Sequence, residues 1–279
     1  MSLGMSLGMR KILALSCCCA DVFPEQSIVY IGGNALNLAV ICAKSKEAVS
    51  VYVAGNVGTD SYGSEIKAIA DKYNINRDKL IELPGETAYN LVYLTESGDR
   101  YFKEGSWSDG VYNSYRIHEE DETFLSGFDA VASTYNDSVF ADLIRFGKAK
   151  QGGQPPLISM DFMEHTPIEK WREYLPSIDL FFISGKPEYF PLLQQWSREF
   201  PGIIFTATLG AQGSIAFQNG SKYQCEAVKV SEVIDTTGCG DAFQGAFIVD
   251  YLHHRDISSA MKAGSKSAAI TLSHMGAIQ

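Results

Sequence analysis

Basic runs and long apolar runs are both missing from this chain of 279 residues. Nucleic-acid-binding proteins carry a patch of Lys and Arg for the phosphates, whereas this chain has a net charge of −10 and no such cluster. A membrane-spanning helix needs about 20 consecutive apolar residues, and the apolar runs here are short and interrupted. We therefore expect neither a nucleic-acid partner nor a membrane partner.

Cysteine is sparse, and its spacing excludes two common roles. The six cysteines form no Cys-x-x-Cys pair with metal-binding spacing, and the adjacent Cys17, Cys18 and Cys19 are poor disulfide partners for one another. No secretory signal is visible. These features favour reduced, mostly buried thiols and a cytoplasmic location.

Several well-known nucleotide-binding motifs are also missing. The chain has no Gly-x₄-Gly-Lys-Ser/Thr loop and no protein-kinase signature, so phosphate would have to be held in another way. A nicotinamide dehydrogenase would carry Gly-x-Gly-x-x-Gly after its first strand, where the three cysteines stand instead.

What is present is the composition of an ordinary globular enzyme, with 46% hydrophobic and 20% charged residues. The length suits one large domain with a small appendage. Met1-Ser2-Leu3-Gly4 is repeated directly as residues 5–8, which has the look of a leader added for expression. We expect a single domain over residues 9–279 and leave residues 1–8 out of the functional argument.

Strand-like apolar runs alternate with helix-like amphipathic segments along most of the chain. The expected buried strands are Ile12–Leu15, Val49–Ala54, Ala130–Ser133, Leu157–Met160, Leu180–Ile183 and Ile203–Thr208. The expected helices cover residues 35–44, 61–73, 137–149, 187–199, 240–253 and 256–273. This alternation predicts an α/β fold in three layers, a doubly wound, mostly parallel sheet covered by helices on both faces. Ligands in such folds bind beyond the carboxyl ends of the strands.

Two segments break the alternation, at about residues 22–31 and 86–104. Residues 27–31 read as extended, and Thr87–Thr95 with Arg100–Lys103 read as a β-hairpin around Ser97-Gly98-Asp99. We expect these strands to form a small β-sheet lid. Extra edge strands on the main sheet are the alternative.

The most informative motif is Asp-Thr-Thr-Gly-Cys-Gly-Asp at residues 235–241, followed by an apolar helix. Glycines let the backbone turn sharply and approach a ligand, and the helix N-terminus offers unpaired N–H donors and a partial positive charge. Such a loop suits a phosphoryl group, and Asp241 is placed to take a proton from an attacking hydroxyl. A simple helix cap is the alternative for Asp241.

A second motif, Gly32-Gly33-Asn34-Ala35-Leu36-Asn37, lies about 200 residues earlier. Asn34 and Asn37 are three residues apart and so lie near one face of a helix, where two amides suit the recognition of vicinal sugar hydroxyls. A helix cap at Asn34 and a solvated amide at Asn37 are the alternative.

The two motifs, in this order, resemble the signatures of the ribokinase (PfkB-type) sugar kinases, and the resemblance spans nearly the whole chain from Met9. It implies a ribokinase-like fold, a β-sheet lid over the sugar, and phosphoryl transfer from ATP to a sugar or nucleoside hydroxyl. By resemblance Asp241 is the general base, and Gly238, Cys239 and Gly240 supply N–H groups to the γ-phosphate. Family members usually carry Ala at the position of Cys239, so a small filler is expected there rather than a reactive thiol.

The resemblance also implies a nucleotide side and ions. Thr208-Leu209-Gly210-Ala211-Gln212-Gly213 resembles the segment that contacts ATP in the family, although alone it reads as a plain hairpin. Thr208, Gly210, Gly213, Thr236 and Gly276 are accordingly candidate ATP contacts. Mg²⁺ is expected with ATP, and Asp235 and Thr237 are candidates for a monovalent cation such as K⁺.

On the sugar side, the family often places an Asp after the first strand, which here is Asp21. Gly32, Gly33, Asn34 and Asn37 join it as candidate substrate contacts, with a turn-capping role as the alternative for Asp21. Tyr89 and Tyr101, on the expected lid strands, are candidates to cover the sugar ring, with packing inside the lid as the alternative.

One region departs from the family pattern. Many members carry Asn-x-x-Glu after a central strand to organise phosphate and Mg²⁺, whereas this chain reads Ser184-Gly185-Lys186-Pro187-Glu188. The Asn is replaced and Glu188 comes one residue late, so Glu188 is a weak candidate for Mg²⁺.

Within the family, the segments Ala20–Pro24 and Gly32–Ala35 look most like fructoselysine 6-kinases, which implies a small-molecule ketose or ketose-amine substrate phosphorylated at a primary hydroxyl. A nucleoside kinase of the same family and a non-catalytic sugar or nucleotide sensor on the kinase fold are the alternatives. A homodimer formed lid to lid is compatible with the resemblance.

Overall fold

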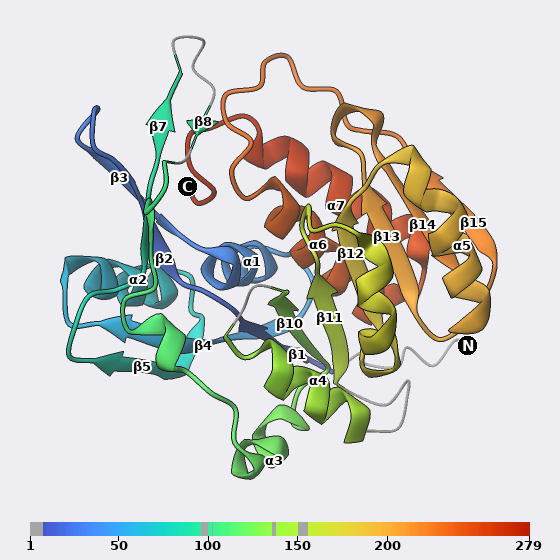
Figure 1. Cartoon of the computed structure of the whole chain (residues 1–279), viewed down its shortest axis with the longest axis horizontal. Helices are drawn as coiled ribbons and strands as arrows, with labels where there is room; N and C mark the ends of the chain where they lie inside the picture. Colours follow the sequence, from blue (N-terminus) through green and yellow to red (C-terminus); the bar gives the residue numbers. More distant parts are fainter. Residues whose placement is uncertain (1–7, 96–99, 102, 136–137, 150–155) are drawn as a thin grey trace, which may run out of the picture.

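The structure is a computed structural model, and it describes residues 8–95, 100–101, 103–135, 138–149 and 156–279. Residues 1–7 of the expected leader, the expected hairpin turn at 97–99 and the first position of the expected helix 137–149 lie outside the described residues. Figure 1 shows the course of the chain, with a large central sheet and a small sheet beside it.

The large sheet lies at the centre of the fold, and its order in the described chain is β15-β14-β13-β12-β11-β10-β1-β4-β5. The seven strands from β13 to β5 pair parallel, whereas β14 and β15 add antiparallel at one edge. In sheet order the bounds are Ser221–Cys225, Ser214–Gln218, Ile204–Thr208, Leu180–Ser184, Leu157–Asp161, Ala130–Thr134, Arg10–Leu15, Val49–Gly58 and Asn76–Leu83. All six expected strands are confirmed in this sheet.

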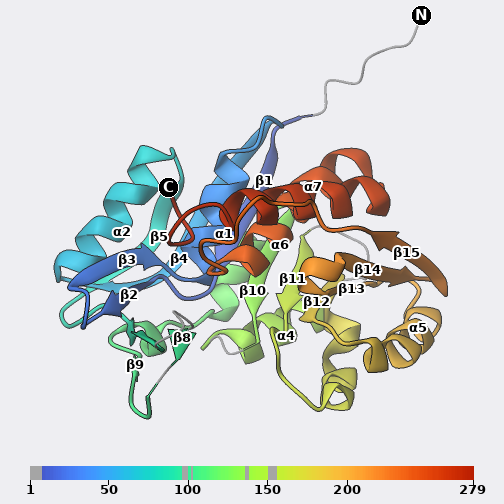
Figure 2. The same cartoon turned by 90° about the horizontal axis from the view of Figure 1, so that it is seen from above.

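Helices cover both faces of the large sheet, as the near-continuous apolar strands require. Side chains alternate along β1: Ile12 and Ala14 belong to one apolar core, and Leu13 and Leu15 to the other. The first core includes residues of α1, α2, α6 and α7, and the second includes residues of α4 and α5 (Figure 2). Their bounds are Asn34–Ala43, Ser61–Lys72, Cys239–His254 and Ile257–Thr271 for the first group, then Phe140–Ala149 and Phe190–Glu199. The predicted three-layer, doubly wound fold is confirmed.

A separate small sheet forms from two parts of the chain. The first part lies between β1 and α1, and the second lies between β5 and α3 (Glu122–Leu125). Its order is β3-β2-β6-β9, with bounds Ile28–Gly32, Cys19–Phe23, Tyr89–Leu91 and Trp107–Ser108. The predicted hairpin forms as the pair β7 (Tyr93–Leu94) and β8 (Arg100–Tyr101). The small sheet starts before residue 22 and ends beyond residue 104, so the expected boundaries were too narrow: β9 lies outside them.

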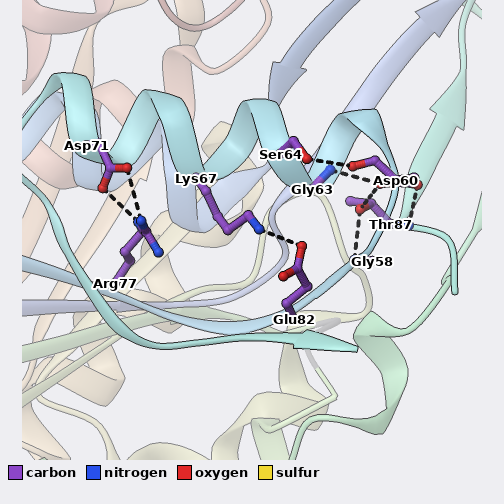
Figure 3. A network of polar contacts seen from close by, with 9 residues as sticks. All are labelled: Gly58, Asp60, Gly63, Ser64, Lys67, Asp71, Arg77, Glu82 and Thr87. Atoms are coloured by element: carbon purple, nitrogen blue, oxygen red, sulfur yellow. Dashed lines mark hydrogen bonds and ion pairs between the residues drawn. The ribbon is translucent and has the colours of Figure 1, made fainter. Parts of the chain in front are cut away.

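The chain passes from the large sheet to the small one through a buried polar junction at Thr87 (Figure 3). Asp60 caps α2 by accepting a hydrogen bond from the Gly63 amide, and the same carboxylate accepts from the Thr87 amide and hydroxyl. The Thr87 hydroxyl also accepts from the Gly58 amide at the end of β4. These contacts fix where β6 begins relative to the large sheet.

Two ion pairs on the solvent side of α2 are drawn in the same view (Figure 3). Lys67 pairs with Glu82, which ties the helix to β5. Arg77, also on β5, pairs with Asp71. Exposed pairs of this kind contribute little to stability, so the hydrogen bonds between the half-buried Asp60 and the buried Thr87 are the stronger constraint.

Candidate active site

A cavity of about 270 Å³ opens between the carboxyl end of the large sheet and the small sheet. The chain segments after β1, β10 and β11 meet there with the N-terminus of α1 and the loop that follows β9. The described lining residues are Ser16, Cys17, Asn34, Trp107, Asp109, Tyr112, Asn113, Thr134 and Met163. Its volume is close to the lower end of the roughly 300–1,000 Å³ usual for small-ligand sites.

The start of α1 is pressed against the end of β1 by Gly33. This residue has φ of 90°, and a Cβ built on it would lie 2.4 Å from the Cys17 carbonyl oxygen. Only glycine fits that conformation and that approach. A Cβ on the neighbouring Gly32 would lie 2.7 Å from Oδ1 of Asn37. The two glycines thus set the first turn of α1, including Asn34 and Asn37, at the edge of the cavity.

Asp241 lies in the first turn of α6 and is 5% exposed. Nδ2 of Asn34 donates to its Oδ1 over 2.8 Å, and Nδ2 of Asn37 donates to its Oδ2 over 2.8 Å. Burial, helped by the negative charges of Asp161 and Asp21, raises the pKa of Asp241 to about 7 against the lowering effect of the two amides. The two sequence motifs therefore meet in space, with Asn34 between Asp241 and the cavity.

Asp161, at the end of β11, is a second carboxylate of the site that the sequence argument missed. Burial raises its pKa to about 6, against one hydrogen bond donated by the Met163 amide. Its Oδ2 lies 3.8 Å from where a Cβ on Gly240 would stand, so it faces the glycine loop. An acid directly after the predicted buried strand 157–160 was the available signal, because ligands gather at the carboxyl ends of parallel strands.

The glycine loop turns into α6 at Gly238, which has φ of 72° in the left-handed region. A Cβ on Gly238 would lie 2.3 Å from Cβ of Ala277. The Cys239 amide donates to the Thr236 carbonyl over 3.3 Å, which closes the turn. Burial, together with the charges of Asp235 and Asp241, raises the pKa of the Cys239 thiol to about 12, so this thiol is not activated and the expected filler role fits it.

Asp235, 6% exposed, holds the loop to the C-terminal segment. One carboxylate oxygen accepts from the amide and hydroxyl of Thr237, and the other accepts from the Gly276 amide over 2.8 Å. Three of the candidate residues are thus brought together by hydrogen bonds. The Asp235 carboxylate already accepts three hydrogen bonds, so few of its lone pairs are available to bind a monovalent cation.

The candidate nucleotide segment connects β13 to β14 as a tight turn. The Leu209 amide donates to the Gly213 carbonyl over 2.8 Å, and Gly210 and Gly213 have φ of 55° and 87°. Thr208 ends β13, and its hydroxyl donates to the Ile183 carbonyl on β12. The turn therefore lies at the same carboxyl edge of the large sheet as the glycine loop.

Some candidates are not brought to the cavity. Tyr89 pairs within the small sheet, and Tyr101 lies on β8 with its ring 5.7 Å from that of Tyr93. Neither lines the cavity, where Trp107 stands instead. Asp21 lies on β2, the inner neighbour of β3, and acts on Asp241 through its charge. Glu188 is exposed in the short 3₁₀ segment Pro187–Tyr189.

The residues present fit a phosphate and its divalent metal ion. The first turn of the 16-residue helix α6, entered through a left-handed glycine, suits a phosphoryl group. The buried Asp241 and the half-buried Asp161 lie near that turn, and Mg²⁺ typically takes one or two carboxylates and completes its shell with phosphates and water. Within the described residues no group of three or more His, Cys, Asp or Glu is placed to hold a metal ion by itself.

A model of the pfkB family of carbohydrate kinases matches residues 24–186 and 194–279. The chain is 28% identical over 275 residues to fructoselysine 6-kinase of Shigella flexneri, covering 96% of this chain and all of that protein. It is 28% identical to fructosamine kinase FrlD of Bacillus subtilis strain 168, covering 96% and 92%. The structure of Arabidopsis thaliana ribokinase complexed with ribose and ATP superposes with a TM-score of 0.78 at 20% identity, covering 96% and 94%.

The fold and the site define a phosphotransferase with an alcohol group as acceptor. The chain belongs to the pfkB family of carbohydrate kinases. Membership of a kinase family implies the use of ATP with a divalent metal ion, and a small-molecule sugar as acceptor. No helix in the described part of the chain has the length and apolar character to span a membrane.

Proposed function

We propose that this kinase phosphorylates a fructosamine-type sugar derivative, such as fructoselysine, at a primary hydroxyl with ATP as donor. The observation that carries the proposal is Asp241: a buried carboxylate with a pKa of about 7, at the start of α6 and one side chain removed from the cavity. Relatives named for fructoselysine and fructosamine, similar along nearly the whole chain, support the substrate class.

In this mechanism Asp241 is the general base. A hydroxyl held in the cavity loses its proton to the Asp241 carboxylate as its oxygen bonds to the γ-phosphorus, and the bond from that phosphorus to ADP breaks. A base whose pKa lies near the working pH is the most effective, and about 7 meets that condition. Asn34 and Asn37 hold the carboxylate in place until the substrate hydroxyl approaches.

The first turn of α6 stabilises the transferring phosphoryl group through its N–H donors and its dipole. The left-handed conformation of Gly238 sets the direction in which the chain enters this turn. The hydrogen bonds from Thr237 and Gly276 to Asp235 hold the loop before the turn in place. Losing one preorganised donor in such a site typically costs about 10²–10³ in rate. Mg²⁺ bound near Asp161 and Asp241 would neutralise phosphate charge.

The nucleotide is proposed to lie along the carboxyl edge, against the Thr208–Gly213 turn and the segments around Thr236 and Gly276. Because ATP is the donor, we place the reaction in the cytoplasm. A K⁺ requirement at Asp235 and Thr237 is the least supported part, since the Asp235 carboxylate is already hydrogen-bonded by three donors. Comparing rates in K⁺, Na⁺ and choline salts tests it.

The small sheet is proposed to act as a lid on the single kinase domain, residues 9–279, and as a dimer surface. On β3, Ile28 and Val29 are 43% and 40% exposed, an apolar pair at the edge of that sheet. Sedimentation of the wild type and of Val29→Lys tests the dimer. A monomeric wild type would overturn it.

The test of function is ADP release with Mg-ATP against fructoselysine, other ketose-amines, fructose, ribose and adenosine. We expect one ketose-amine to exceed the rest by at least tenfold, and Asp241→Asn to lower that turnover by about 10²–10⁴ while the protein still binds ATP. A normally folded Asp241→Asn variant with kcat within threefold of the wild type would refute the assignment of the base.

A nucleoside kinase is the second candidate, because Trp107 offers an exposed indole beside the cavity on which a base could stack. The same panel separates the two. Turnover of adenosine above that of every ketose-amine would favour the nucleoside assignment.

A further inference from the structure

One carboxylate projects to the cavity from the small-sheet side, and it is held in a fixed orientation. Asp109 follows β9, where its carbonyl accepts from the Tyr112 amide over 3.0 Å. Its Oδ1 accepts from Nε1 of Trp107 over 2.5 Å, and its Oδ2 accepts from Nδ2 of Asn113 over 3.2 Å. Trp107, Asp109 and Asn113 all line the cavity.

The charge of Asp109 is not neutralised by its neighbours. Both donors are uncharged, and in the described part of the chain no Lys, Arg or His forms an ion pair with this carboxylate. The described lining contains no basic side chain at all, and Asp241 lies behind Asn34. A cavity with carboxylates on two sides and no cation attracts a positively charged ligand and disfavours an acidic sugar.

Trp107 adds a second feature that suits a cation. Trp107 is 43% exposed and lines the cavity, and the hydrogen bond from Nε1 to Asp109 fixes the edge of the indole. An ammonium group above an indole face is attracted by the ring electrons. The carboxylate of one residue and the indole of the other thus present a joint surface for an amine.

We propose that Asp109 and Trp107 form the specificity site for a protonated amine carried on the sugar, so that the substrate class is the ketose-amines rather than neutral ketoses. This inference rests on the proposed function for the position of the sugar. With the reacting hydroxyl near Asp241 and Asn34, the amino substituent lies toward Asp109. A secondary ammonium donates one hydrogen bond to the carboxylate and lies against the indole.

Binding measurements with two matched ligands test the inference without requiring turnover. The ligands are 1-deoxy-1-butylamino-fructose, a cation, and the 1-O-butyl ether of fructose, its neutral counterpart. Isothermal titration to the full-length chain is expected to give at least tenfold tighter binding of the amine, because a hydrogen bond between two charged groups is roughly twice as strong as one between neutral groups. Asp109→Asn, which keeps shape and removes charge, is expected to shrink that ratio to about twofold.

Two further variants complete the experiment. Trp107→Leu removes the indole and is expected to reduce the amine preference by several-fold. Glu65→Gln removes one exposed charge on α2, outside the cavity, and controls for net charge; it is expected to keep the full preference. Thermal unfolding of each variant checks its fold, and the amine-to-ether ratio of the wild type stands even if a variant does not fold.

The failures of this inference and of the proposed function are distinguishable. Equal binding of amine and ether by the wild type, or an unchanged ratio in Asp109→Asn, overturns the inference even if a sugar is phosphorylated. An amine preference lost in Asp109→Asn supports it even if no member of the substrate panel is turned over. If neutral ketoses are phosphorylated efficiently and an amino group does not increase the rate, the protein is a kinase but the proposed amine site is overturned.

Discussion

Asn37 and Asp241 lie 204 positions apart in the chain, yet Nδ2 of Asn37 donates to Oδ2 of Asp241 over 2.8 Å inside the protein. Both side chains are 5% exposed. Oδ1 of Asn37 is buried without a hydrogen-bond partner in the described part of the chain. The helices α1 and α6, which pack against each other, are therefore joined at the two motifs by this contact and by the one from Asn34, and the pair fixes the proposed base.

Replacing Asp241 by Asn is expected to lower kcat by about 10²–10⁴, the usual contribution of a general base. ATP affinity is expected to change little, because the glycine loop remains. The amide can keep the packing: if Asn37 rotates, its unpartnered Oδ1 can accept from the new side chain. Steady-state kinetics and ATP titration check this, and a variant within threefold of the wild-type kcat would contradict it.

The same substitution is expected to stabilise the fold in a pH-dependent manner. The pKa of this carboxyl is near its ordinary value of 3.8 when the chain is unfolded and about 7 when it is folded, so the folded state binds the proton more tightly. Stability from this group is fully present below the unfolded pKa and is lost as the pH rises to about 7. Chemical unfolding at pH 8 should show Asp241→Asn more stable by on the order of 1–3 kcal/mol, with the two curves converging near pH 4. A constant difference across this range would argue against a raised pKa.

The pH profile of activity follows from the same carboxyl. Because the base must be ionised, kcat/KM should fall on the acid side of about pH 7, by tenfold for each further unit. Asp161→Asn removes a negative charge that raises the pKa of Asp241, so the acid limb should move to lower pH. Profiles of kcat/KM for both proteins check this. A limb that stays in place, or moves to higher pH, would contradict the coupling of the two carboxyls.

The central strands were predictable because they are buried on both faces and read as continuous apolar runs. The edges were not. β5 carries Arg77, Asp78, Lys79 and Glu82, and within it only Leu80 is buried, so its strand character comes from pairing with β4 and not from its own pattern. β15, at the other edge, has no buried residue.

The chemistry of the site divides in the same manner. Asp241 and its glycines form a local motif, so the sequence suffices to find them. Asp161 faces Gly240 only because the sheet and α6 bring them together, and Trp107 with Asp109 comes from a two-residue strand that has no pattern of its own. The position of Asp161 after a buried strand was a signal that it lies at the carboxyl edge of the sheet, but spacing alone could not show its partner Gly240 or find Trp107 and Asp109.

Gly238→Ala is expected to damage both folding and catalysis. A residue with a side chain is strained at φ of 72°, by roughly 1–2 kcal/mol, and the new Cβ would overlap that of Ala277 at 2.3 Å. The N-terminus of α6 has to shift, so kcat should fall at least tenfold. Gly202→Ala is the matched control, since a Cβ there meets nothing within 4 Å, and it should keep wild-type kinetics and stability. Equal behaviour of the two variants would show that the loop tolerates a side chain.

Thr87→Val tests whether the buried junction holds the small sheet over the cavity. Valine keeps the shape but leaves the Gly58 amide without its acceptor and removes the hydroxyl donor to Asp60, which should cost about 1–3 kcal/mol of unfolding free energy. Because Thr87 sets the start of β6, the KM for the sugar should rise more than the KM for ATP. Thr87→Ser keeps the hydroxyl, so its unfolding free energy and its KM for the sugar should be close to the wild-type values.

Ser64→Ala is the control for Thr87→Val. The exposed Ser64 hydroxyl donates to the Asp60 carbonyl in the same network, and its loss should change stability by less than about 0.5 kcal/mol (Figure 3). A Thr87→Val variant with equal changes in both KM values would limit the junction to stability.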